Sequence, residues 1–167
     1  MPKTKLRVGI MGWEPDKKSQ EAEARVVELL RMHYRATEAM RSRDASHDVC
    51  FTLPYGTKRL CEIKTDFLAS QTKNLYFETR NTQHGCPSGL TLTRADVWGH
   101  YVPHLKKLWL FDPKALLWYL RAHRDNPMLG IVLSRPNSGD HNSQGYIVPI
   151  KTAQKWSWPS VLEVDTP

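Results

Sequence analysis

The sequence predicts a single α/β domain in which helices flank a central mixed β-sheet. The chain has 167 residues, a length that suits one domain over residues 1–167 and is enough to bury a hydrophobic core. Apolar residues make up 40% of the chain, which excludes a disordered or fibrous protein. Segments with helical spacing of apolar residues are interspersed with short strand-like runs, a pattern typical of mixed α/β folds.

The first expected elements are a short strand, a helix and a β-hairpin. Residues 8–11 are apolar enough for the strand. Apolar residues then recur at helical spacing over residues 20–34 and would face the core; they are Ala22, Val26, Leu29, Leu30 and His33. Residues 47–53 and 58–65 are predicted to be strands, and the turn signal at residues 54–57 joins them as a hairpin.

The middle of the chain is expected to hold a third strand, a loop and a short helix. Residues 74–79 are rich in aromatic side chains and predict the strand, and the polar residues 80–89 predict the loop. Residues 93–98 suit a short helix capped by Thr93. His100 and His104, which flank Pro103, are expected at the surface or facing DNA.

The C-terminal part is expected to form a strand, a helix and a second hairpin. The apolar run at residues 108–111 is typical of a buried strand. Asp112 as N-cap and Pro113 as the first helical residue then start a helix over residues 114–123. Residues 130–134 and 145–150 are two further strands joined by a polar loop. Four tryptophans are assigned to core or satellite packing: Trp109, Trp118, Trp156 and Trp158.

Charge and cysteine content limit the partners and the compartment. Lys and Arg number 24 against 17 Asp and Glu, a net charge of +7, which suits a polyanionic partner such as nucleic acid as well as it suits mere solubility. No stretch approaches the roughly 20 apolar residues of a membrane span, so we expect a cytoplasmic protein without a membrane partner. Three cysteines without a C-x-x-C pair indicate neither a disulfide framework nor a zinc knuckle.

The first hairpin carries the residues that suggest chemistry. Period-2 alternation puts Glu62 and Lys64 on one face of their strand, with Ile63 on the other. Closure of the hairpin at residues 54–57 would bring Asp48 opposite them. Carboxylates are the ligands Mg²⁺ prefers, and the backbone carbonyl of Ile63 is a further oxygen donor. A solvated surface pair of Glu62 and Lys64 is the alternative, but the apolar strand around them favours paired or metal-bound charges.

Further motifs follow this E-x-K strand in order. They are T-D at residues 65–66, T-K-N-L-Y-F-E at residues 72–78, S-G-L at residues 88–90 and T-R-A-D-V-W at residues 93–98. Together with a glutamate-bearing helix and Asp48, this set resembles the PD-(D/E)xK nuclease superfamily, in particular the small phage- and archaeal-type members related to Holliday-junction resolvases. The likeness spans about residues 19–111. His47 stands where the motif name has proline.

The resemblance implies a restriction-endonuclease-like core and a Mg²⁺- or Mn²⁺-dependent DNA endonuclease. Asp48 and Glu62 would bind the metal, with Lys64 as the catalytic lysine. A helix glutamate would complete the metal site. Glu21 is favoured because it lies with Glu28 on one polar stripe, and Glu23 fits almost as well.

The same resemblance suggests the substrate and its contacts. Holliday junctions or other branched DNA of recombination would be cut, and two symmetric cuts imply a homodimer. A phage origin, and with it the cytoplasm of a host cell, rests on the resemblance alone. Residues around the proposed metal site would contact the substrate. They are Lys73, Asn74, Glu78, Ser88, Thr93 and Arg94. Two alternatives stay open, namely a non-catalytic nucleic-acid-binding module on a degenerate nuclease fold and an RNA-cleaving or restriction-type nuclease.

Overall fold

The computed structural model describes residues 17–42, 47–134 and 142–163, and it confirms the α/β class. The helices are α1 (Lys17–His33), α2 (Ala69–Thr72), α3 (Pro113–Ala122) and α4 (Ile150–Ala153), with 3₁₀ turns η1 (Gly89–Thr91) and η2 (Pro103–Leu105). The strands are β1 (Glu38–Arg41), β2 (Val49–Thr52), β3 (Lys58–Thr65), β4 (Asn74–Asn81), β5 (Cys86–Pro87), β6 (Val97–Val102), β7 (Lys107–Phe111), β8 (Val132–Leu133), β9 (Ser143–Pro149) and β10 (Ser160–Glu163). The strand expected over residues 8–11 lies outside the described residues.

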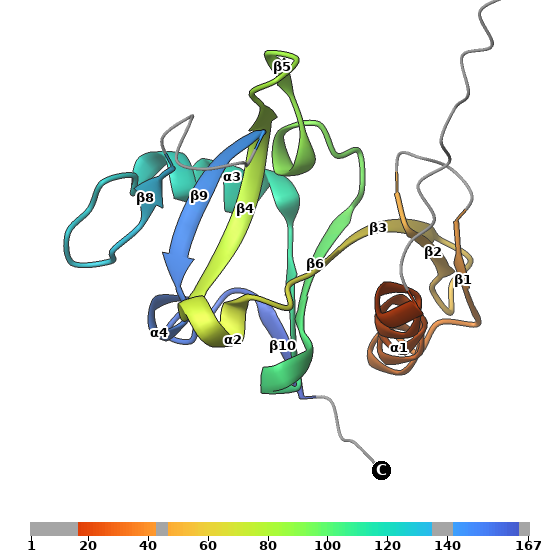
Figure 1. Ribbon diagram of the computed structural model, residues 1–167. Coiled ribbons are helices and arrows are strands. Elements are labelled where there is room, and N and C mark those ends of the chain that lie inside the picture. The colour runs from red at the N-terminus through yellow and green to blue at the C-terminus, as the bar shows by residue number, and fades with distance from the viewer. Residues whose placement is uncertain (1–16, 43–46, 135–141, 164–167) are drawn as a thin grey trace, which may run out of the picture.

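The described strands form two sheets. One is six-stranded in the order β1-β2-β3-β6-β7-β10 and is mixed, because β3 and β6 run parallel while the other neighbours are antiparallel. The other is four-stranded and antiparallel in the order β5-β4-β9-β8. Figure 1 shows β4 and β9 on one side of β6, with β1, β2, β3 and α1 on the other. The mixed sheet is therefore as predicted, but the strand of residues 74–79 belongs to a second sheet.

Two hydrophobic cores lie on opposite faces of the six-stranded sheet. The first lies between this sheet and the four-stranded sheet and includes Phe77, Trp109 and Phe111, with Leu116 and Leu120 of α3. The second lies under α1, which packs its predicted apolar stripe on β2 and β3. Its members are Ala22, Val26, Leu29, Leu30, Ala36, Val49, Phe51, Cys61, Tyr101, Leu108 and Leu110. Side chains alternate along β6 and β7, so both strands supply both cores.

The predictions of the first helix, of the hairpins and of the helix after Asp112 are confirmed with small changes. α1 begins at Lys17, three residues before the expected start. His33 is exposed rather than facing the core, because it is the last residue of α1 and its ring contacts Tyr34 edge-on at 4.7 Å. Asp112 caps α3 as predicted, since its Oδ1 accepts hydrogen bonds from the backbone N–H groups of Lys114 (2.8 Å) and Ala115 (2.9 Å).

Three other predictions are wrong. Residues 93–98 form no helix; instead β6 begins at Val97, and the backbone N–H of Asp96 donates to the Leu60 carbonyl of the neighbouring strand. Trp118 is 71% exposed on the outer face of α3 rather than packed. His100, expected at the surface, is fully buried because it lies on the β6 face that meets the four-stranded sheet. No helix in the described ranges is long and apolar enough to span a membrane.

Candidate active site

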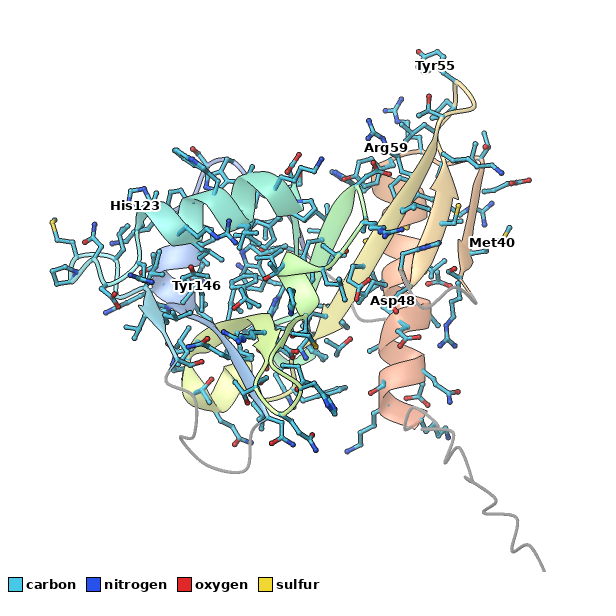
Figure 2. All side chains as sticks on the ribbon, turned by 90° about the horizontal axis from the view of Figure 1, so that it is seen from above. Met40, Asp48, Tyr55, Arg59, His123 and Tyr146 are labelled. Carbon is cyan, nitrogen blue, oxygen red and sulfur yellow. The ribbon has the colours of Figure 1, made fainter. Side chains whose placement is uncertain are left out.

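The first hairpin brings Asp48 to the middle of the E-x-K strand. β2 and β3 pair antiparallel with Thr52 opposite Lys58 and Val49 opposite Cys61. One residue further, the backbone N–H of Asp48 donates to the Cys61 carbonyl (3.0 Å), and its carboxylate Oδ2 accepts from the Ile63 N–H (2.7 Å). Figure 2 shows Asp48 at the end of the hairpin away from Tyr55, which marks the tip. The predicted approach of Asp48 to this part of β3 is therefore confirmed.

Alternation along β3 separates the charged side chains from the core. Cys61 and Ile63 pack in the core under α1. Glu62 and Lys64 therefore project from the opposite face of the strand. Lys64 lines a groove there, together with residues of β4 and β9. The face that carries these charges is thus the one that meets the four-stranded sheet.

The surroundings of both carboxylates disfavour their charged forms. Burial raises the pKa of Asp48, and the hydrogen bond from Ile63 and the nearby His47 and Arg41 offset this only in part. Burial and the negative Asp48 raise the pKa of Glu62 to about 7, against an opposing influence of Lys64. Two acids and one ammonium thus lie within electrostatic range of one another, in a place where solvation is reduced. A cation bound between the acids would relieve this repulsion.

The helix glutamates lie on the other side of the sheet. Glu21 is on an exposed part of α1, where its 66% exposed side chain forms an ion pair with Lys17 at 3.8 Å. Glu23 is 22% exposed and pairs with Arg41, whose charge acts on Asp48. Of the two candidates, the structure therefore connects Glu23 with the site. Within the described ranges, His, Cys, Asp and Glu form no group of three or more that could hold a metal ion.

Glu78 reaches the groove from the second sheet. Its strand, β4, does not follow β3 in the six-stranded sheet, because β6 is the neighbour of β3 there. Even so, Glu78 lines the groove with Lys64. Its Oε1 accepts a hydrogen bond from Ser88 Oγ at 2.6 Å. Two residues named separately in the sequence as substrate contacts are thus in direct contact.

The other predicted substrate contacts are spread over the surface. Asn74 lines the groove, and Lys73 is exposed beside it at the end of α2. Arg94 is exposed and Thr93 is half-buried. Thr93 does not cap a helix; its backbone N–H donates to the Gly89 carbonyl and its Oγ1 accepts from the Ala95 N–H. The backbone N–H of Ser88 is likewise used, by the Thr79 carbonyl, so these two N–H groups are not free for phosphate.

The pair of Asp66 and His100 was not anticipated. Asp66 Oδ1 accepts from the backbone N–H groups of Leu68 (3.0 Å) and Ala69 (2.9 Å), which fixes the turn after β3. Its Oδ2 lies 3.4 Å from His100 Nε2. Burial lowers the pKa of His100 despite this carboxylate, while the hydrogen bonds and His100 lower the pKa of Asp66 against the opposing influence of burial. The T-D motif was a signal for Asp66, whereas nothing in the sequence placed His100 opposite Lys64 across the parallel ladder.

Comparisons with known proteins add little. No protein-family model matches the chain, and no curated protein matches it. Among solved structures, the bacterial homing endonuclease I-Ssp6803I aligns over 63% of this chain and 74% of its own, with a TM-score of 0.45 and 16% sequence identity. At these values nothing about activity is carried over from it.

Proposed function

We propose that this protein is a Mg²⁺-dependent nuclease that hydrolyses phosphodiester bonds of DNA at Asp48, Glu62 and Lys64. One observation carries the proposal: the hairpin brings two partly buried carboxylates together beside an ammonium, and Asp48 helps to raise the pKa of Glu62 to about 7. Such repulsion has a free-energy cost, and raised pKa values of this kind concentrate at functional sites. The apolar surroundings of β3 give no structural reason for two acids at this position.

The donor set fits Mg²⁺. This ion is commonly held by one or two carboxylates and keeps its remaining positions for water and substrate phosphate. Asp48 and Glu62 would hold it, with the Ile63 carbonyl as a further oxygen donor, and Mn²⁺ would be accepted in its place. When bound, the ion would polarise the scissile phosphate and neutralise the charge that develops on it.

The remaining residues would position the reactants. The Lys64 ammonium, on the same face as Glu62, would orient the attacking water and balance negative charge at phosphorus. Of the two helix glutamates, Glu23 would act on the site indirectly, by positioning Arg41, whose charge acts on Asp48, whereas Glu21 pairs with Lys17 in solvent. Lys73 and Arg94 are exposed cations that would contact backbone phosphates.

The preferred substrate is proposed to be a Holliday junction or other branched DNA, cut by a homodimer. This finer assignment rests on the order of motifs shared with resolvase-related nucleases, and on the net charge of +7, which suits a polyanion. A non-catalytic binding module is disfavoured because Asp48, Glu62 and Lys64 are all present and converge. An RNA-cleaving or restriction-type nuclease would use the same site.

The test compares four DNA shapes with and without Mg²⁺. A four-way junction should be cut faster than linear duplex, flap or single strand, and Lys64→Ala should abolish cutting while DNA binding persists. Lys151→Ala removes an exposed lysine of α4 and is the matched control. Equal cutting of all four shapes would reject the junction assignment. The molar mass of the protein–DNA complex would show whether a dimer or a monomer binds.

A further inference from the structure

A groove opens beside Lys64 between the end of β3 and the outer face of the four-stranded sheet. Its volume is ≈ 570 Å³, within the range of about 300–1,000 Å³ that is typical of small-molecule sites. The lining residues that matter for its chemistry are Lys64, Asp66, Phe67, Tyr76, Glu78 and Ile147. The groove therefore joins the proposed cutting site directly, through Lys64.

We infer that this groove binds one unstacked nucleobase of the DNA, so that the protein prefers sites where a base is unpaired. The inference deepens the proposed function and rests on it, because it takes DNA to be the substrate. The groove would bind a base, whereas Asp48, Glu62 and Lys64 would act on the phosphate.

The walls of the groove supply flat and apolar surfaces. Tyr76 of β4 pairs with Ile147 of β9, and both line the groove. Tyr76 is half-buried and lies outside both described core clusters, and its hydroxyl lies 3.1 Å from Ser143 Oγ of β9, which holds the ring along the groove wall. Phe67 also lines the groove, from the segment after β3, but it packs partly against the core under α1, so Tyr76 is the main wall. Aromatic rings placed in this way are stacking platforms for single bases.

The charge of the groove favours a base over a phosphate. Among the lining residues that the structure describes, Lys64 is the one cation, and Asp66 and Glu78 are the acids. Asp66 is engaged by Leu68, Ala69 and His100. A phosphate entering the groove would meet two carboxylates, whereas a neutral base would not be repelled.

Glu78 provides a specific contact for a base. Its Oε1 is occupied by Ser88, and among the described residues Oε2 remains available to accept a hydrogen bond. Carboxylates accept from the exocyclic amino group of a base such as cytosine. Because the hydrogen bond from Ser88 fixes the Glu78 side chain beside the Tyr76 wall, stacking and edge contact can be made by one base.

A base within a paired duplex cannot make these contacts. Both of its faces are stacked and its pairing edge is used, so it must be extruded first, at a cost of a few kcal/mol. A bulged, mismatched or single-stranded base avoids most of that cost. The groove would therefore direct cutting toward distorted or branched DNA, because unpaired bases enter it at a lower free-energy cost.

The experiment measures binding without cleavage. Fluorescein-labelled duplexes, one fully paired and one with a single extra cytosine, are titrated with full-length protein in EDTA, and anisotropy gives both Kd values. The bulged duplex should bind at least about fivefold more tightly, since stacking of one base has that effect or more. Tyr76→Leu should remove the preference and Tyr76→Phe should keep it. Trp118→Leu, which removes an exposed ring outside the groove, should leave it unchanged.

The outcomes separate the two proposals. Equal affinity of wild type for both duplexes, or a preference that survives Tyr76→Leu, would overturn the nucleobase groove whatever the cleavage assay gives. A preference that depends on Tyr76 in a protein that cuts no DNA with Mg²⁺ or Mn²⁺ would support the groove and refute the nuclease. Because each preference is a ratio of two affinities of one variant, partial misfolding cancels.

Discussion

Glu62→Gln should change how the stability of the metal-free protein depends on pH. The pKa of Glu62 is raised from 4.5 to about 7 by burial and by Asp48. The folded state therefore holds a proton that the unfolded state has released between these values. Stability due to this group is present below the lower pKa and is lost as the pH rises through the higher one. A glutamine amide cannot ionise, so the variant lacks this loss.

The expected size follows from the two pKa values. Each pKa unit corresponds to about 1.4 kcal/mol, so linkage between about pH 5 and about pH 8 gives at most about 2.5 kcal/mol of the free energy of unfolding. Because solvent reaches part of the side chain and screens its charge, we expect a loss of about 1–2 kcal/mol. Urea unfolding of wild type and Glu62→Gln at both pH values, in EDTA, measures how much the pH-dependent loss differs between the two proteins, and titrating groups that do not interact with Glu62 cancel in this comparison. Bound Mg²⁺ should reduce the loss at the higher pH, since the ion offsets the repulsion.

A null result would refute the electrostatic account of the site. If wild type and Glu62→Gln lost stability equally between the two pH values, Glu62 would not be held in a desolvated place beside a second acid. The principal reason for placing a cation there would then be gone. A matched control is Glu163→Gln, because the Glu163 side chain is 77% exposed and its removal should leave the pH dependence as in wild type.

Three further predictions concern residues around the site and the fold. In a cleavage assay, Glu23→Gln should lower the rate about tenfold, as expected for a group that supports metal ligands, whereas Glu21→Gln should have little effect; the reverse order would favour Glu21. Asp112→Ala should lower the free energy of unfolding by about 1 kcal/mol in urea, because two N–H groups at the start of α3 lose their cap. Gly145→Ala should cost about 1–3 kcal/mol by the same measurement, because a Cβ there would lie 2.3 Å from the Phe77 carbonyl oxygen; unchanged stability would contradict the close pairing of β4 and β9.

The sequence was sufficient to predict the first hairpin and the start of α3, because both depend on interactions between residues near in sequence. The turn at residues 54–57 and the alternation in β3 fix the hairpin register, and the register alone brings Asp48 to Ile63. Asp112 and Pro113 determine the start of α3 through hydrogen bonding and a fixed φ angle. In such cases the interacting groups are near in sequence, so spacing was sufficient.

Pairing between distant segments could not be predicted from spacing. Residues 93–98 have the composition of a capped helix, but the parallel partner β3 makes a strand of Val97 and Trp98. β4 pairs with β9 about 70 residues later along the chain, a choice between sheets that no local pattern expresses. His100 appeared to be a surface residue for the same reason, since its burial depends on the second sheet.

Cleavage by wild type and Asp48→Asn tests the central claim most directly. Both proteins are incubated with four-way junction and linear DNA in Mg²⁺, and binding is measured in parallel in EDTA. The wild type should cut and Asp48→Asn should not, with similar affinity for DNA. Asp125→Asn, at an exposed aspartate far along the chain, should cut as wild type does. Cutting by Asp48→Asn at the wild-type rate, or no cutting by wild type with either Mg²⁺ or Mn²⁺, would contradict the claim.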